Sequence, residues 1–152
     1  MRPGCASLAF ALALISGTLA PGRLPAEEPA AYRVIVNAAN PVSSLKRVQV
    51  SKLFLERGTW SHGPAGDPVD LSATSPVRAA FSSEVLGQSV EAVQNHWRRR
   101  LLEKRDPPPK ARATDEDVIV HVLKSPGAIG YVSAAATLPE GVRELRVPDP
   151  LR

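Results

Sequence analysis

The stretch Thr114-Asp-Glu-Asp-Val-Ile-Val-His-Val-Leu-Lys124-Ser-Pro-Gly-Ala128-Ile-Gly-Tyr-Val132 decides the fold class of this chain. Thr114 is a helix-capping residue, and three acids follow it in the first turn, where the helix dipole favours negative charge. Lys124 brings the matching positive charge to the other end, and Ser-Pro-Gly stops the helix. The apolar run from Ala128 to Val132 is typical of a buried strand. The stretch therefore predicts a helix followed by a strand.

The rest of the chain repeats this alternation. Three further strands are expected, at 33–37, 68–71 and 142–147. Three further helices are expected, at 45–57, 76–86 and 90–105. Ser75 and Ser89 are suitable N-caps, and Pro76 suits the first helical position. Alternating strands and helices predict a layered α/β fold.

The third of these helices, 90–105, has two distinct features. Its apolar stripe, Val90, Val93, Trp97 and Leu101, is expected to face the core. Its C-terminal end is rich in arginine and lysine. This basic cluster either contacts an acidic partner or a membrane headgroup, or is a solvated helix face, and the interspersed Glu91 and Glu103 favour the solvated face.

The first residues resemble an export signal. Arg2 precedes an apolar run that contains Cys5, the single cysteine of the chain, and small residues follow this run. The run is shorter than the roughly 20 residues that span a bilayer, although an uncleaved anchor is the alternative. We therefore expect four segments: a secretory signal 1–26, a linker 27–31, a domain 32–147 and a tail 148–152. The mature protein is expected to be periplasmic or secreted, with no transmembrane anchor after signal cleavage.

Charge and motifs exclude several functional classes. Removing residues 1–26 takes away two arginines and no acid, so the net charge falls from +4 to +2, too little to indicate nucleic acid as the main partner. Neither a Gly-x-Ser-x-Gly elbow nor a Walker loop is present, which argues against catalysis. His62, His96 and His121 lack the spacing of metal ligands. We therefore expect no enzymatic activity, metal or cofactor.

Several segments resemble, in order, the phosphate-binding proteins of bacterial ABC transporters and their short single-domain relatives. The segments are 36–45 with Leu53-Phe-Leu55 and Trp60, 75–81, His96-Trp97 with 107–109, and 126–132. The resemblance implies one three-layer lobe of the type II periplasmic binding protein fold, a mixed sheet with flanking helices. It matches only the later lobe of the two-lobed receptors. It also implies inorganic phosphate or a similar oxyanion as ligand, and an ABC permease or another binding lobe as partner.

The candidate anion site is Ser72, Thr74, Ser75 and Arg78. Free N–H groups at a helix start favour an anion, and a bound anion would offset the unfavourable position of Arg78 in the first turn. Pro76 and Val77 stand where the family has Gly-Thr. The alternative is an ordinary capped helix with a solvent-exposed Arg78. Two functions follow: an exported oxyanion-binding domain of an ABC transport system, or an exported interaction module that kept the lobe but lost ligand binding.

Overall fold

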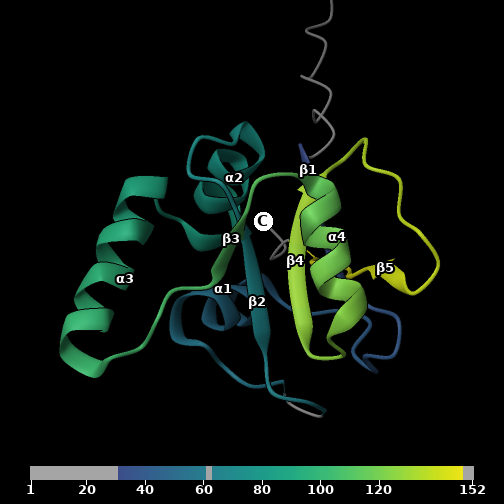
Figure 1. Ribbon diagram of the computed structural model, residues 1–152, viewed down its shortest axis with the longest axis horizontal. Coiled ribbons are helices and arrows are strands. Elements are labelled where there is room, and N and C mark those ends of the chain that lie inside the picture. The colour runs from purple at the N-terminus through teal and green to yellow at the C-terminus, as the bar shows by residue number, and fades with distance from the viewer. Residues whose placement is uncertain (1–30, 61–62, 149–152) are drawn as a thin grey trace, which may run out of the picture.

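The computed structural model describes residues 31–60 and 63–148 (Figure 1). The strands are β1 Tyr32–Asn37, β2 Asp67–Leu71, β3 Lys110–Arg112, β4 Ala128–Ser133 and β5 Val142–Glu144. The helices are α1 Arg47–Glu56, α2 Pro76–Phe81, α3 Val90–Lys104 and α4 Asp115–Lys124, with a π-helical turn, η1 Ser82–Leu86, directly after α2. The predicted signal 1–26 lies outside the described residues, and the segment boundaries expected at the two ends remain predictions.

The strands form one mixed sheet in the order β3-β2-β4-β1-β5. Strand β2 runs parallel to β3 and β4, and β1 runs antiparallel to β4 and β5. Neighbouring residues of β4 point to opposite faces of this sheet. Tyr131 stacks on Phe81 at the end of α2, whereas a Cβ on Gly130 would meet Val118 and Val122 of α4. Helices therefore cover both faces, which gives the three layers predicted from the sequence (Figure 1).

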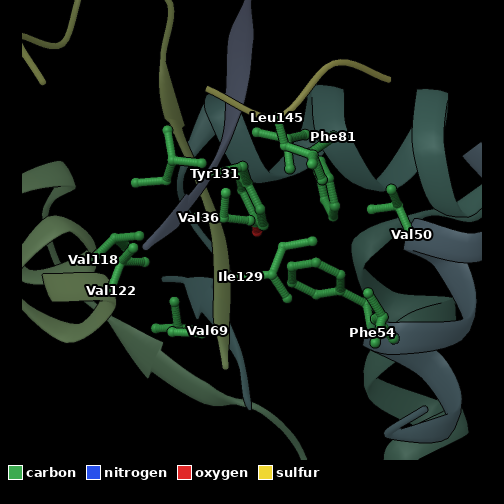
Figure 2. Packing of buried hydrophobic residues seen from close by; sticks show 14 of the residues in the cluster. Val36, Val50, Phe54, Val69, Phe81, Val118, Val122, Ile129, Tyr131 and Leu145 are labelled. Atoms are coloured by element: carbon green, nitrogen blue, oxygen red, sulfur yellow. The ribbon is translucent and has the colours of Figure 1, made fainter. Parts of the chain in front are cut away.

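The core consists of two apolar layers, one on each face of the sheet (Figure 2). On one face, the rings of Phe81 and Tyr131 stack with their centroids 3.9 Å apart, and Phe54 of α1 packs against Phe81 at 4.9 Å. On the other face, a Cβ at Gly130 would lie 2.7 Å from side-chain atoms of both Val118 and Val69. Glycine at this position therefore lets α4 approach the sheet closely.

Most of the predicted elements are confirmed, with differences at their ends. The first helix begins at Arg47 rather than Leu45, and Arg57 takes the left-handed C-cap conformation, with φ 51°, directly before Gly58. The last strand ends at Glu144 instead of Val147. Strand β3 was not predicted, because the prolines before it indicate only the end of a helix. Its three residues gain their strand conformation by pairing with the edge of β2.

The predicted core face of α3 is only partly correct. Val93 and Trp97 are buried, whereas the side chain of Leu101 is 47% exposed. His96 Nε2 bonds to the Leu55 carbonyl oxygen of α1 at 2.8 Å, which fixes the N-terminal part of the helix to the body. The last turn of α3 lies beyond these contacts, so the apolar stripe continues into solvent at Leu101.

Candidate functional site

The structure brings the three predicted hydroxyl residues together in the turn between β2 and α2. The Ser75 backbone N–H donates to the Ser72 carbonyl oxygen at 2.9 Å, and the Ser72 and Thr74 hydroxyl oxygens lie 3.1 Å apart. Ser75 is the N-cap of α2, as predicted, and its Oγ accepts from the Arg78 N–H at 3.4 Å. The turn follows the carboxyl end of β2, the edge at which open α/β sheets commonly bind ligands.

Arg78 lies inside the lobe rather than at its surface. The residue is only 7% exposed, and its Nη2 lies 2.8 Å from Oδ2 of Asp70. Its Nη1 donates to the Leu71 carbonyl oxygen at 2.6 Å. The positive charge is thus already paired within the chain. Both interpretations of the sequence placed the guanidinium at the surface, and the structure differs because Asp70 of β2 faces α2.

Tyr131 of β4 completes a buried triad with Asp70 and Arg78. The Tyr131 hydroxyl donates to Oδ1 of Asp70, and the Leu71 N–H donates to the same carboxylate oxygen at 3.0 Å. Burial raises the pKa of Asp70, while the Arg78 charge and these hydrogen bonds oppose the rise. Burial and the neighbouring Asp70 charge raise the pKa of Tyr131. The triad therefore ties the start of α2 to two central strands.

A signal for this triad was present in the sequence. Asp70 is an acid in a strand that is otherwise apolar from Pro68 to Leu71. A buried carboxylate is rarely tolerated without a cation or hydrogen-bond donors, so an acid in such a strand indicates a partner elsewhere. The sequence did not identify Tyr131 as that partner, because the two residues are 61 positions apart.

A second polar chain, Asp67–His121–Arg112, lies on the α4 side of the sheet. His121 Nε2 is 2.7 Å from Oδ2 of Asp67, and its Nδ1 is 3.1 Å from Nη2 of Arg112. Arginine has only donors, so Nδ1 accepts and Nε2 carries the proton that is donated to Asp67. The imidazole thus joins α4 to both β2 and β3. Within residues 31–60 and 63–148, no three His, Cys, Asp or Glu side chains form a group able to hold a metal ion.

A surface cavity of about 260 Å³ lies beside α1, away from the predicted site residues. Its lining residues are Leu45, Gln49, Lys52, Leu53, Glu56, Gly58, Thr59 and Trp60. Trp60 is itself held by a hydrogen bond from its Nε1 to the Gly127 carbonyl oxygen at 3.0 Å. None of the predicted anion-site residues contributes to this cavity, so it provides no support for that site.

The structure is similar to solved phosphate receptors. The ABC-type phosphate transport receptor from Vibrio cholerae matches with a TM-score of 0.58 and 20% sequence identity, over 77% of this chain and 46% of the receptor. A second match is a protein from Clostridium perfringens, assigned as a phosphate ABC transporter substrate-binding protein and solved with bound phosphate. Its TM-score is 0.60 and its sequence identity is 20%, over 77% of this chain and 44% of that protein. The fold is that of one lobe of a type II periplasmic binding protein. The resemblance predicted from the sequence is therefore confirmed at the level of the fold.

A third similar structure is PstS from Borrelia burgdorferi, with a TM-score of 0.57 and 15% identity, over 77% of this chain and 47% of PstS. The chain thus spans less than half the length of each of these three proteins. No protein-family model and no curated protein matches its sequence. Across the described part of the chain, no helix has the length and apolar character needed to cross a membrane.

Proposed function

We propose that this domain works outside the cytoplasm as the binding lobe for phosphate or a related oxyanion in an ABC transport system. The observation that carries the proposal is the fold, which is shared with three phosphate transport proteins at TM-scores of 0.57 to 0.60. In this proposal, a second lobe or an ABC permease supplies the other side of the site.

The proposed ligand position is the turn formed by Ser72, Thr74 and Ser75. The Ser72 and Thr74 hydroxyls, 3.1 Å apart, are hydrogen-bond donors suited to the oxygens of an anion. Arg78 lies beneath the turn, but its ion pair with Asp70 reduces the potential that an anion would experience. Affinity for the isolated lobe should thus be weak, on the order of millimolar or about −4 kcal/mol, and should fall with added salt.

An amide NMR titration with phosphate and sulfate tests this site. Thr74→Val removes an exposed hydroxyl with little change in shape, and Thr137→Val makes the same change in an exposed loop after β4. Wild type and Thr137→Val should show saturable shifts centred on 72–79, and Thr74→Val should lose them. The absence of shifts in wild type above about 10 mM anion, several times the expected dissociation constant, would contradict the proposal. Substitution of Arg78 is a poor test, because it also leaves Asp70 unpaired.

Export is part of the same proposal and has its own test. Arg2 and the apolar run after it have the architecture of a secretory signal. Mass spectrometry of the protein from its native host should find an N-terminus between about residues 20 and 31, the range that this architecture allows. Recovery of the intact chain from Met1 in the soluble cytosol would contradict export.

A second candidate function is an exported interaction module that kept the lobe and lost the ligand. The specific observation in its favour is the 2.8 Å pairing of Arg78 with Asp70, which already neutralises the charge proposed to attract an anion. Pro76 also removes one N–H from the start of α2. This candidate predicts no anion shifts in the titration, together with binding to a second lobe or a permease that is equally tight with and without phosphate.

A further inference from the structure

The last turn of α3 presents leucine side chains to solvent at the outer edge of the molecule. Leu101 is 47% exposed and Leu102 is 79% exposed. Trp97, one turn earlier, is the last residue of the helix that is buried in the core. Figure 1 shows α3 beside the sheet rather than over it, and its C-terminal end lies at the periphery. The described residues thus leave Leu102 largely uncovered and cover about half of Leu101.

Arginines flank these leucines along the chain. Arg98, Leu101 and Leu102 follow the spacing i, i+3 and i+4, which places them on one side of the helix. Arg105 directly follows the helix as its left-handed C-cap, with φ 56°. We call these four residues the leucine–arginine stripe. Arg98 lies about 100° around the helix from the buried Trp97, and Leu102 lies about 140° from it. Leu101 lies only about 40° from Trp97 and is 47% exposed, at the border of the packed face. Arg98 and Leu102 therefore lie outside the face that holds α3 to the body.

Most cations around the stripe have no carboxylate partner among the described residues. Five basic residues and one acid, Glu103, occupy 98–105. Arg100 pairs with Asp106 at 2.6 Å and lies over the Trp97 ring, so it belongs to the body. Among the described residues, no carboxylate forms an ion pair with the other four cations: Arg98, Arg99, Lys104 and Arg105. The side-chain bond from Arg98 goes to the neutral amide oxygen of Asn95. The end of the helix is therefore strongly positive.

We propose that the leucine–arginine stripe docks the domain on an anionic phospholipid surface. Leucine side chains enter the boundary between headgroups and acyl chains, and flanking arginines contact the lipid phosphates. We favour a lipid surface over an acidic protein because Leu102, which is 79% exposed at the projecting end of the helix, adds an apolar contact to the cationic ones, as expected at a membrane interface. This surface is separate from the turn 72–75, so the inference does not depend on anion binding there.

Vesicle co-sedimentation of the mature chain tests the inference. Wild type should bind vesicles of phosphatidylcholine with about one third phosphatidylglycerol, should bind pure phosphatidylcholine far less, and should dissociate as salt is raised. A cation near an anionic bilayer contributes about 1 kcal/mol, so Arg98→Gln should weaken partitioning about fivefold. Leu102→Ser should weaken it by a similar factor, because the serine loses the partial burial of an apolar side chain.

Matched controls separate docking from general effects of charge and hydrophobicity. Lys124→Gln removes an exposed cation at the end of α4, and Val48→Ser removes an apolar side chain of α1 that is 58% exposed. Both controls should bind anionic vesicles as tightly as wild type. The inference is wrong if wild type binds both vesicle compositions equally or binds neither. It is also wrong if the two controls lose as much affinity for anionic vesicles as Arg98→Gln and Leu102→Ser do. Binding to polyglutamate without binding to vesicles would instead indicate an acidic protein partner and would overturn the lipid assignment.

Discussion

Replacing Arg78 with methionine is the most direct test of the buried triad. The change removes the guanidinium and keeps a flexible apolar side chain of similar reach. It leaves the Asp70 carboxylate, whose side chain is 8% exposed, with only the Tyr131 hydroxyl and the Leu71 N–H as partners. It also removes the donor that bonds to the Leu71 carbonyl oxygen at 2.6 Å. Breaking one side of a buried ion pair typically costs about 3–5 kcal/mol of folding free energy.

The titration of Asp70 limits the part of this cost that comes from the unpaired charge. The unpaired carboxyl can avoid a buried charge by taking up a proton when the chain folds. From an unfolded pKa of 3.8, protonation costs about 1.4 kcal/mol for each pH unit above that value, or about 4 kcal/mol at pH 7. We therefore expect Arg78→Met to lower the free energy of unfolding by about 3–5 kcal/mol near pH 7.

The same argument fixes the sign of the pH dependence. Loss of Arg78 raises the folded pKa of Asp70 further above its unfolded value. The stability contribution of such a group is complete below the unfolded pKa and is lost as pH rises through the folded pKa. The deficit of Arg78→Met relative to wild type should accordingly shrink by about 1.4 kcal/mol for each unit as pH falls from about 7 to about 5.

Urea denaturation followed by the fluorescence of the buried Trp60 and Trp97 measures both effects. The control is Arg99→Met, which makes the same change at an exposed residue and should alter stability by no more than about 0.5 kcal/mol. Adding Asp70→Asn to Arg78→Met removes the stranded charge and should recover much of the loss. A deficit under about 1 kcal/mol at pH 7, or one that is equal at pH 5 and pH 7, would refute the role given to the triad.

Three further predictions concern the core and the triad. Trp97→Ala should cost about 3–5 kcal/mol, as large-to-small core changes do, and an unchanged urea midpoint would show that α3 does not pack through this ring. Gly130→Ala should cost about 1–3 kcal/mol, because the new Cβ would lie 2.7 Å from side-chain atoms of Val69 and Val118; a melting temperature equal to wild type would contradict this packing. Because burial raises the pKa of Asp70 in wild type, its ¹³Cγ NMR signal should titrate above 3.8, and a midpoint below that value would be inconsistent with the balance of burial and pairing.

The local elements of this protein were predictable from the sequence because their signals act over a few residues. Ser75 and Thr114 each cap a helix by accepting a hydrogen bond from the backbone three residues later. The apolar runs of β1 and β4 mark strands covered on both faces, and their alternation with helices indicates the layered class. The order of the family-like segments also led to the correct fold, because each segment keeps its place along the chain.

The tertiary structure alone decided which side chains meet. The predicted site depended on Arg78 facing outward, and the fold turned it toward an acid eight positions earlier, which also accepts a hydrogen bond from a tyrosine on a third element. Likewise, the apolar periodicity of α3 continues beyond the end of the core. The exposure of Leu101 and Leu102 therefore follows only from the tertiary structure, which shows where the core against α3 ends. Pairing between distant segments depends on the free energy of the whole packed lobe, and no local pattern carries that information.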